Sequence, residues 1–345
     1  MRESRLRAAT IRERAPLAVG MLRNYVPWIV LVIVVVVFSS LDPAFLSVTN
    51  LMSILNAATI GGLLAIGLTF VLLAGGFDLS ISSIMLVGGM IFGTLFINLQ
   101  LSVGAAVFLS LAATTALGLV NGLVVTRVKL PPFIATFATM FVYTGMSLAI
   151  GKGMAIYFIK GPYFTFLGQG KLGAMPMPAV IFIIAAIVAY LVLRTTPFGR
   201  AVYAVGGNDK AAHMSGINVD RVRLVTYIIS GFLCGLGALI YTARLEVANV
   251  VTATLAGYST TLLDAIAAVM IGGISIFGGV GKMYGLIGGI LLVFALSNGM
   301  GILGMTQAYH ILAKGLLIVL AVGMDIYFRS GVSLRRLLKL DTLKK

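Results

Sequence analysis

The sequence predicts an all-α polytopic membrane protein with about ten transmembrane helices, and its composition is the first reason. Of its 345 residues, 60% are hydrophobic and only 10% are charged, whereas soluble domains average about 25% charged residues. Such a chain lacks the polar surface that covers a globule in water, so we expect it in a lipid bilayer. The second reason is pattern: residues 28–38 are apolar on every face, whereas the strands of a membrane barrel alternate. Both observations predict a helical bundle.

The first predicted helix follows a basic arm, residues 1–24, and begins near Pro27. A basic start before an apolar run is also typical of a signal peptide, but no small-residue cleavage pair follows Phe38, so we interpret the run as a retained helix. The membrane domain is predicted over 25–328 and a basic tail over 329–345. Nine further helices are expected near 51–74, 80–98, 101–126, 132–150, 178–194, 223–243, 262–277, 284–303 and 308–328.

Basic residues predict the orientation, because the loops on the cytoplasmic side of a membrane protein are enriched in lysine and arginine. With ten helices both termini share one side, and that side collects 20 of the 25 basic residues. Both termini are therefore predicted in the cytoplasm. The glycine-rich segment 272–284 falls on the same side, as a loop or a re-entrant hairpin.

Glycines four residues apart predict close helix contacts, within one chain or between two. They occur at Gly89/Gly93, Gly118/Gly122, Gly231/Gly235 and Gly281/Gly285/Gly289. On the outer side, segment 152–177 contains three lysines, no acid and five aromatic residues. We interpret it either as an aromatic belt at the membrane surface or as a docking surface for an acidic partner.

Several kinds of chemistry are not supported by the sequence. Cys234 is the only cysteine and has apolar neighbours, which favours a structural thiol. His213 and His310 are far apart and lack further ligands at metal-site spacing. Segment 278–283 resembles a phosphate loop but lacks its first glycine and its final hydroxyl residue. We therefore predict a non-catalytic chain with no metal, no cofactor of its own and no nucleic-acid partner, the charge of +15 reflecting topology.

Two aspartates lie near predicted helix starts, and both are expected to cap those starts. Asp78 lies in the run GGFDLS, and Asp264 lies in the first turn of the predicted helix 262–277. A carboxylate there accepts hydrogen bonds from the first amides of the helix. A direct role in a solute path is the alternative. Lys314 is expected to extend toward the membrane surface or to pair with an acid of another helix, and Asp325 to pair with Arg329.

The predicted cytoplasmic loop 195–221 contains a short helix outside the membrane. Asn208 is expected to cap a helix over 209–215, and Gly216 to end it in the left-handed conformation. An isolated helix of two turns is unstable in water. The sequence therefore indicates either a linker helix held by its own subunit or a helix that docks into a cytoplasmic partner.

Three motifs resemble the permease subunits of ribose-type ABC importers. They are GGFDLS at 75–80, RAVYAVGGNDKAA at 200–212, continued by SGINV at 215–219, and LDAIAAVMIGG at 263–273. The likeness extends from about residue 40 to 328. The family's usual glutamate after Gly257-Tyr258 is replaced by Ser259.

This resemblance implies a second permease subunit, two cytoplasmic ATPase subunits or one tandem ATPase that binds ATP and Mg²⁺, and an outer binding protein that delivers a monosaccharide. It also implies a bacterial inner membrane. The short helix would then couple the permease to the ATPase, through Gly207, Asn208, Asp209, Lys210, Ala211, Ala212, His213, Met214, Ser215 and Gly216.

A path for a neutral sugar needs polar groups but no buried charge. The candidates are Asn56, Asn121 and Thr136, together with Asp78 and Asp264; each hydroxyl or amide has a bond to its own helix as the alternative. Two other functions remain open from sequence. One is a transporter driven by an ion gradient, with broken helices near residues 75 and 275. The other is a structural subunit of a heteromeric pair.

Overall fold

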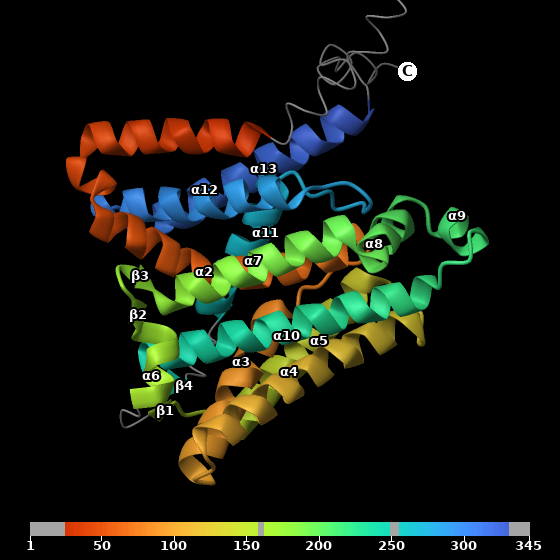
Figure 1. Cartoon of the computed structure of the whole chain (residues 1–345), viewed down its shortest axis with the longest axis horizontal. Helices are drawn as coiled ribbons and strands as arrows, with labels where there is room; N and C mark the ends of the chain where they lie inside the picture. The colour runs from red at the N-terminus through yellow and green to blue at the C-terminus, as the bar shows by residue number, and fades with distance from the viewer. Residues whose placement is uncertain (1–24, 158–161, 249–254, 331–345) are drawn as a thin grey trace, which may run out of the picture.

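A computed structural model describes residues 25–157, 162–248 and 255–330 (Figure 1). The predicted basic arm 1–24, the tail from 331 onward, Phe158 and Lys160 lie outside the described residues, as do the side chains of Asp325 and Arg329. The described chain is mostly helical, with two short pairs of strands and no closed sheet.

The first half of the described chain contains a helix at Tyr25–Leu41 and, in order, η1 (Pro43–Leu46, a 3₁₀ helix), α2 (Val48–Leu73), α3 (Ile81–Gly93), η2 (Thr94–Asn98, a π-helix), α4 (Val103–Thr126), α5 (Pro132–Gly151), β1 (Ile156–Tyr157), α6 (Pro162–Gln169), β2 (Lys171–Leu172) and β3 (Met175–Pro176). The second half contains α7 (Met177–Thr195), α8 (Pro197–Gly207), α9 (Asp209–Met214), α10 (Val219–Leu245), β4 (Val247–Ala248), α11 (Leu255–Ile271), α12 (Met283–Ile302) and α13 (Gln307–Ser330).

Seven of the described helices are long and apolar enough to cross a membrane. Three shorter apolar segments lie at three more of the predicted spans: the helix Tyr25–Leu41, Thr261–Ile271 within α11 and Gln307–Gly323 within α13. The all-α membrane fold is thus confirmed, while the count of ten and the side of the termini remain predictions.

The centre of the bundle is α2, which is almost entirely buried from Ala58 to its end at Leu73. It packs against α10, α7, α11 and α12. A polar side chain on α2 would therefore have no water to bind. Its sequence fits this position, because it is apolar on every face and the hydroxyl of Thr69 donates to the carbonyl of Ala65 within the helix.

Small residues bring the helices together as predicted. Gly118 of α4 lies directly against the Tyr227 carbonyl and Gly231 of α10. In α12, Gly289 lies against the Ala268 carbonyl and Gly272 at the end of α11. A side chain at either glycine would push two backbones apart, so the predicted glycine contacts are confirmed within one chain.

The two ends of the bundle differ in structure. At one end, opposite the short strands in Figure 1, α8 and α9 project from the bundle. At the other end α6 and the strands form a cover, in which β1 pairs with β4 through Ile156 and Ala248 and β2 pairs with β3. Phe164 of α6 is buried and stacks on Phe92 of α3, with ring centroids 4.0 Å apart. This aromatic residue therefore anchors the cover instead of forming part of a surface belt.

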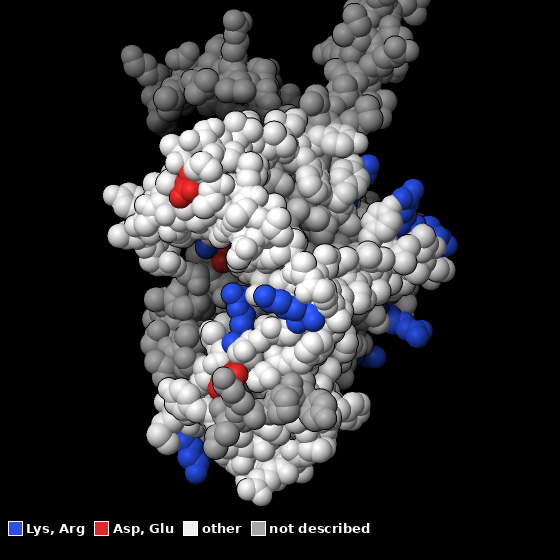
Figure 2. Space-filling model, turned by 60° about the vertical axis from the view of Figure 1, so that its left-hand side comes forward, with Lys and Arg blue, Asp and Glu red and all other residues white. Residues whose placement is uncertain are grey.

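Basic side chains are found at both ends of the bundle. In Figure 2 they project along the right-hand edge, and a smaller group lies across the middle of the face turned forward, on the side of α6 and the strands in Figure 1. Exposed Tyr157 lies at the same end. The proposed docking surface for an acidic partner there stays a prediction.

Candidate functional site

The short helix α9 forms where the sequence predicts it. Its N-cap, Asn208, accepts a hydrogen bond from the amide of Ala211 at 3.0 Å. After Met214 the chain turns at Gly216, whose φ of +82° is the left-handed conformation that suits glycine. Both predicted helix signals are confirmed.

The faces of α9 differ in exposure. Ala212 is only 4% exposed and belongs to the core of its own chain, whereas Met214 is 89% exposed. Lys210, Ala211 and His213 are also exposed. The Ala212 side chain therefore holds α9 to its own subunit, and Met214 offers the free apolar surface.

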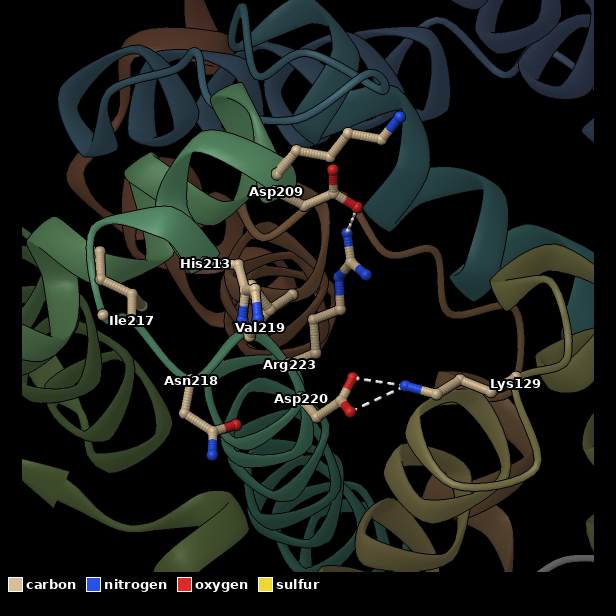
Figure 3. Close-up of a pocket in the computed structure, with 10 residues that line it drawn as sticks. Lys129, Asp209, His213, Ile217, Asn218, Val219, Asp220 and Arg223 are labelled. Atoms are coloured by element: carbon tan, nitrogen blue, oxygen red, sulfur yellow. Dashed lines mark hydrogen bonds and ion pairs between the residues drawn. The ribbon is translucent and has the colours of Figure 1, made fainter.

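A pocket of about 620 Å³ lies between α9 and the start of α10 (Figure 3). Its walls include Lys129 from the α4–α5 connection, Asp209 and His213 from α9, and Asp220 and Arg223 from α10. Two ion pairs cross it, drawn as dashed lines in Figure 3: Lys129 Nζ lies 2.7 Å from Asp220 Oδ2, and an Arg223 guanidinium nitrogen lies 3.4 Å from Asp209 Oδ2.

Arg223 connects three elements. Besides its pair with Asp209 of α9, its Nε donates to the carbonyl of Ala74, directly after α2, at 3.2 Å. An α10 residue thus joins the start of α9 to the end of the central helix. Arg223 is one of the 20 basic residues that the sequence assigns to the cytoplasmic side, and sequence reasoning missed this connection.

Segment 272–284, predicted as a loop or a re-entrant hairpin, is a loop between α11 and α12 that packs against α8. The amide of Gly279 donates to the carbonyl of Leu73 at 3.0 Å, and the hydroxyl of Tyr203 donates to the carbonyl of Gly281 at 2.9 Å. Burial raises the pKa of Tyr203 above its usual value, so the hydroxyl remains a donor at neutral pH. Gly206 of α8 lies directly against the Leu73 carbonyl and Gly279. The end of α2, α8 and the loop therefore form one rigid junction.

A second polar group lies inside the bundle, around the segment Phe77–Ser80 between α2 and α3. Asp78 is fully buried. Its Oδ1 accepts from the amide of Ser80 at 2.9 Å and from the Ser80 hydroxyl at 2.6 Å, and its Oδ2 accepts from the Ser230 hydroxyl of α10 at 3.2 Å. The N-cap of α3 is Ser80, so the predicted capping by Asp78 is wrong: its carboxylate holds the segment before the helix.

Two predicted path residues bind to the same segment. Asn121 Nδ2 donates to the Ser80 hydroxyl at 2.6 Å, while its Oδ1 accepts from the Tyr143 hydroxyl at 3.0 Å. The Thr136 hydroxyl lies 3.2 Å from the Phe77 carbonyl and 2.9 Å from the Pro132 carbonyl of its own helix. Tyr227 also donates to the Phe77 carbonyl, at 3.0 Å. Asn121 and Thr136 are fully buried, and in this conformation they position a break between α2 and α3.

The other two path candidates lie elsewhere. Asn56 is on α2, and its buried Oδ1 has no hydrogen-bond partner within the described part of the chain. Asp264 is not in a first helical turn, because α11 begins at Leu255. It pairs with Lys314 of α13, with Nζ to Oδ1 2.6 Å apart. The predicted cap by Asp264 and the predicted extension of Lys314 to the membrane surface are both wrong, and the alternative of an interhelical pair is confirmed.

Sequence reasoning missed Tyr143, Tyr227 and Ser230 as members of the buried polar group. The signal was present: a tyrosine deep within an apolar helix needs a partner for its hydroxyl. The partner itself is not visible in the sequence, because it comes from another helix.

Comparisons with known proteins agree over most of the chain. The family described as "branched-chain amino acid transport system / permease component" matches residues 50–322. The ribose import permease protein RbsC of Bacillus subtilis is 38% identical over 89% of this chain and 94% of its own length. The same-named protein of Haemophilus influenzae is 36% identical over 87% and 92%. The D-allose transport system permease protein AlsC of Escherichia coli is 33% identical over 88% and 91%.

No solved structure matches the chain. The family match covers well over half of the sequence, and the curated relatives span almost its whole membrane domain. The chain therefore belongs to the permease-component family of ABC importers that contains the ribose import permeases, and it is a multi-pass protein of the bacterial inner membrane.

Proposed function

We propose that this chain is the transmembrane permease subunit of an ATP-driven, binding-protein-dependent importer of a monosaccharide or a similar small polyhydroxylated solute. The observation that carries the proposal is the agreement, along nearly the whole length, with permeases named for ribose, D-allose and L-arabinose. The chain itself has no catalytic role in this proposal. ATP and Mg²⁺ bind to the partner ATPase.

In this assembly two permease subunits enclose the path, either two copies or a pair of homologues. Two cytoplasmic ATPase subunits, or one tandem ATPase, dock at the α9 end. A sugar-binding protein docks at the opposite end, near α6. The exposed Met214 supports the position of the ATPase, since a partner docked there would cover this large apolar side chain.

Coupling follows from the contacts around α9. When the ATPase pair closes on ATP, it displaces α9, and the displacement reaches α10 and the end of α2 through Arg223. The junction of Gly206 with Leu73 and Gly279 carries the same displacement into α11 and α12. Tilting of these helices exchanges access from one side of the membrane to the other.

One observation favours a second candidate, transport driven by an ion gradient. The Asp264–Lys314 pair is an ionisable group within the helical bundle, with side-chain exposures of 13% and 8%, and such groups are typical of gradient-driven carriers. The two candidates differ in their energy source, so one experiment separates them.

The experiment is uptake of labelled ribose into liposomes that contain the chain with its co-expressed ATPase, with the binding protein on the outer side. Uptake should require hydrolysable ATP inside the liposomes and should stop with a non-hydrolysable analogue. Uptake that persists without the ATPase and follows an imposed proton or sodium gradient would exclude the ATP-driven importer.

A further inference from the structure

An apolar groove of about 550 Å³ runs between α7 and α10. The two helices both pack against α2 and make little contact with each other, so a space remains between them. In Figure 1 they run side by side across the face turned to the viewer, with α8 at one end. Phe70 of α2 and Thr115 of α4 form the floor, and the walls are residues of α7 and α10 such as Ile181, Val192, Ile228 and Leu236.

The side chains that line the groove are suited to a hydrocarbon chain and not to a polar ligand. Its only hydroxyl belongs to Thr115, which donates to the carbonyl of Leu111 at 2.6 Å within α4. Nothing else in the lining offers a hydrogen bond to a sugar or to water. Ile184, Val188 and Phe232 are exposed on the walls. The groove therefore opens to the side of the bundle that faces the lipid.

The length of the groove fits one acyl chain, and its lining covers the middle of α7 and of α10. From Ile181 to Val192, α7 rises about 16 Å, which is close to half of the roughly 30 Å hydrocarbon core. The groove ends one turn before α7 ends at Thr195, on the side of α8. A transmembrane helix from a second copy would need a contact surface through the whole thickness, whereas one acyl chain that enters from the α8 end needs only this length.

Two arginines lie beyond the α8 end of the groove. Arg221 precedes Ile228 by seven residues, which places it about two turns away on the same face of α10. Arg200 of α8 donates to the carbonyl of Thr195, the last residue of α7, at 3.4 Å. Both arginine side chains are exposed. No acidic residue lines the groove, and Asp209 and Asp220 beyond it pair with Arg223 and Lys129.

We propose that this groove binds an anionic phospholipid, with an acyl chain between α7 and α10 and the phosphate beside Arg200 and Arg221. Basic groups at the cytoplasmic end of an interhelical cleft are a typical environment for such a headgroup. The assignment to the inner leaflet rests on the proposed function, which places α9 in the cytoplasm, but the site requires no particular sugar. Because α7 continues directly into α8 and α9, the lipid would hold the inner end of α7 beside the coupling segment.

The test is native mass spectrometry of the full-length chain, delipidated and then titrated with phosphatidylglycerol or phosphatidylethanolamine. One molecule of phosphatidylglycerol should bind preferentially. The double substitution Arg200→Ala/Arg221→Ala should weaken its binding about 30-fold, from the loss of two arginine–phosphate contacts. Arg194→Ala is the matched control: it lies nine residues beyond Ala185, on the opposite face of α7, and contacts Tyr190.

A second variant tests the acyl chain without changing charge. Ala185 lines the groove and is half-buried, so Ala185→Phe should fill the space and reduce the binding of both lipids. Equal binding of phosphatidylglycerol by the double variant and by Arg194→Ala would overturn the proposal. A disulfide between two copies carrying Ala185→Cys would also overturn it, since protein would then cover the groove. Lipid binding is measured without uptake or hydrolysis, so failure of the importer assignment would be seen separately.

Discussion

Lys314 of α13 and Asp264 of α11 form an ion pair inside the helical bundle, with Nζ and Oδ1 2.6 Å apart. Removal of one partner leaves a charge without compensation in a region of low polarity, and breaking a buried pair costs about 3–5 kcal/mol. We expect Asp264→Asn or Lys314→Met alone to lower the thermal unfolding temperature in detergent strongly. The double variant should recover much of the loss.

The control for that prediction is the exposed pair Lys129–Asp220, whose side chains are 64% and 48% exposed. Lys129→Ala should cost no more than about 1 kcal/mol. An equal loss of stability at the two pairs would contradict the interpretation that burial determines how much an ion pair contributes.

Asp78 should be needed for folding of the α2–α3 connection. In Asp78→Ala the hydroxyls of Ser80 and Ser230 lose their acceptor, and each unsatisfied buried group costs about 1–3 kcal/mol. Yield and thermal stability in detergent measure the loss. Ser82→Ala is the control, because the buried Ser82 hydroxyl has no hydrogen-bond partner among the described residues and its removal should be close to neutral.

Two adjacent glycines predict a sharp difference in coupling. A Cβ atom on Gly206 would overlap the Leu73 carbonyl, whereas one on Gly207 meets nothing within 4 Å. Gly206→Ala should therefore displace α8 from the end of α2 and reduce ATP-dependent uptake strongly, while Gly207→Ala leaves this junction intact and should retain most of the uptake. Similar uptake by the two variants would show that this junction does not carry the coupling.

Met214→Glu should weaken the contact with the ATPase without affecting the fold, because the side chain is 89% exposed. If Met214 is an anchor at that interface, a charge there should lower affinity for the ATPase about tenfold or more, measured by co-purification and by substrate-stimulated hydrolysis. Met154→Glu serves as the control, since Met154 is also exposed but lies near β1. If the Met214→Glu variant forms a normal complex with the ATPase, α9 is not part of that interface.

Local signals in the sequence predicted local structure well. The caps of α9 at Asn208 and Gly216 depend on residues within one turn, and both are as expected. Asp264 was misassigned because the predicted helix began at 262, whereas α11 begins at Leu255 and the polar residues 259–261 lie within it. Serine and threonine are tolerated in membrane helices because they bond to their own helix, so they mark boundaries poorly there.

Interactions between distant segments could not be predicted. Asn121 and Thr136 were singled out as polar residues in apolar helices, but their common contact with Phe77–Ser80 depends on how three helices pack. The same holds for Arg223, whose partners come from α9 and from the residue after α2. Single-sequence patterns give the type of a side chain and its helix face, and packing determines its partner.

The contact of Gly206 with the Leu73 carbonyl and Gly279 joins main chain to main chain, with no side chain between them. A flexible side chain can change rotamer when its neighbour moves, whereas two backbone segments in direct contact have no such freedom and must move together. A displacement of α8 would thus move the end of α2 and the loop before α12 together, although these two segments lie in the first and the last third of the chain.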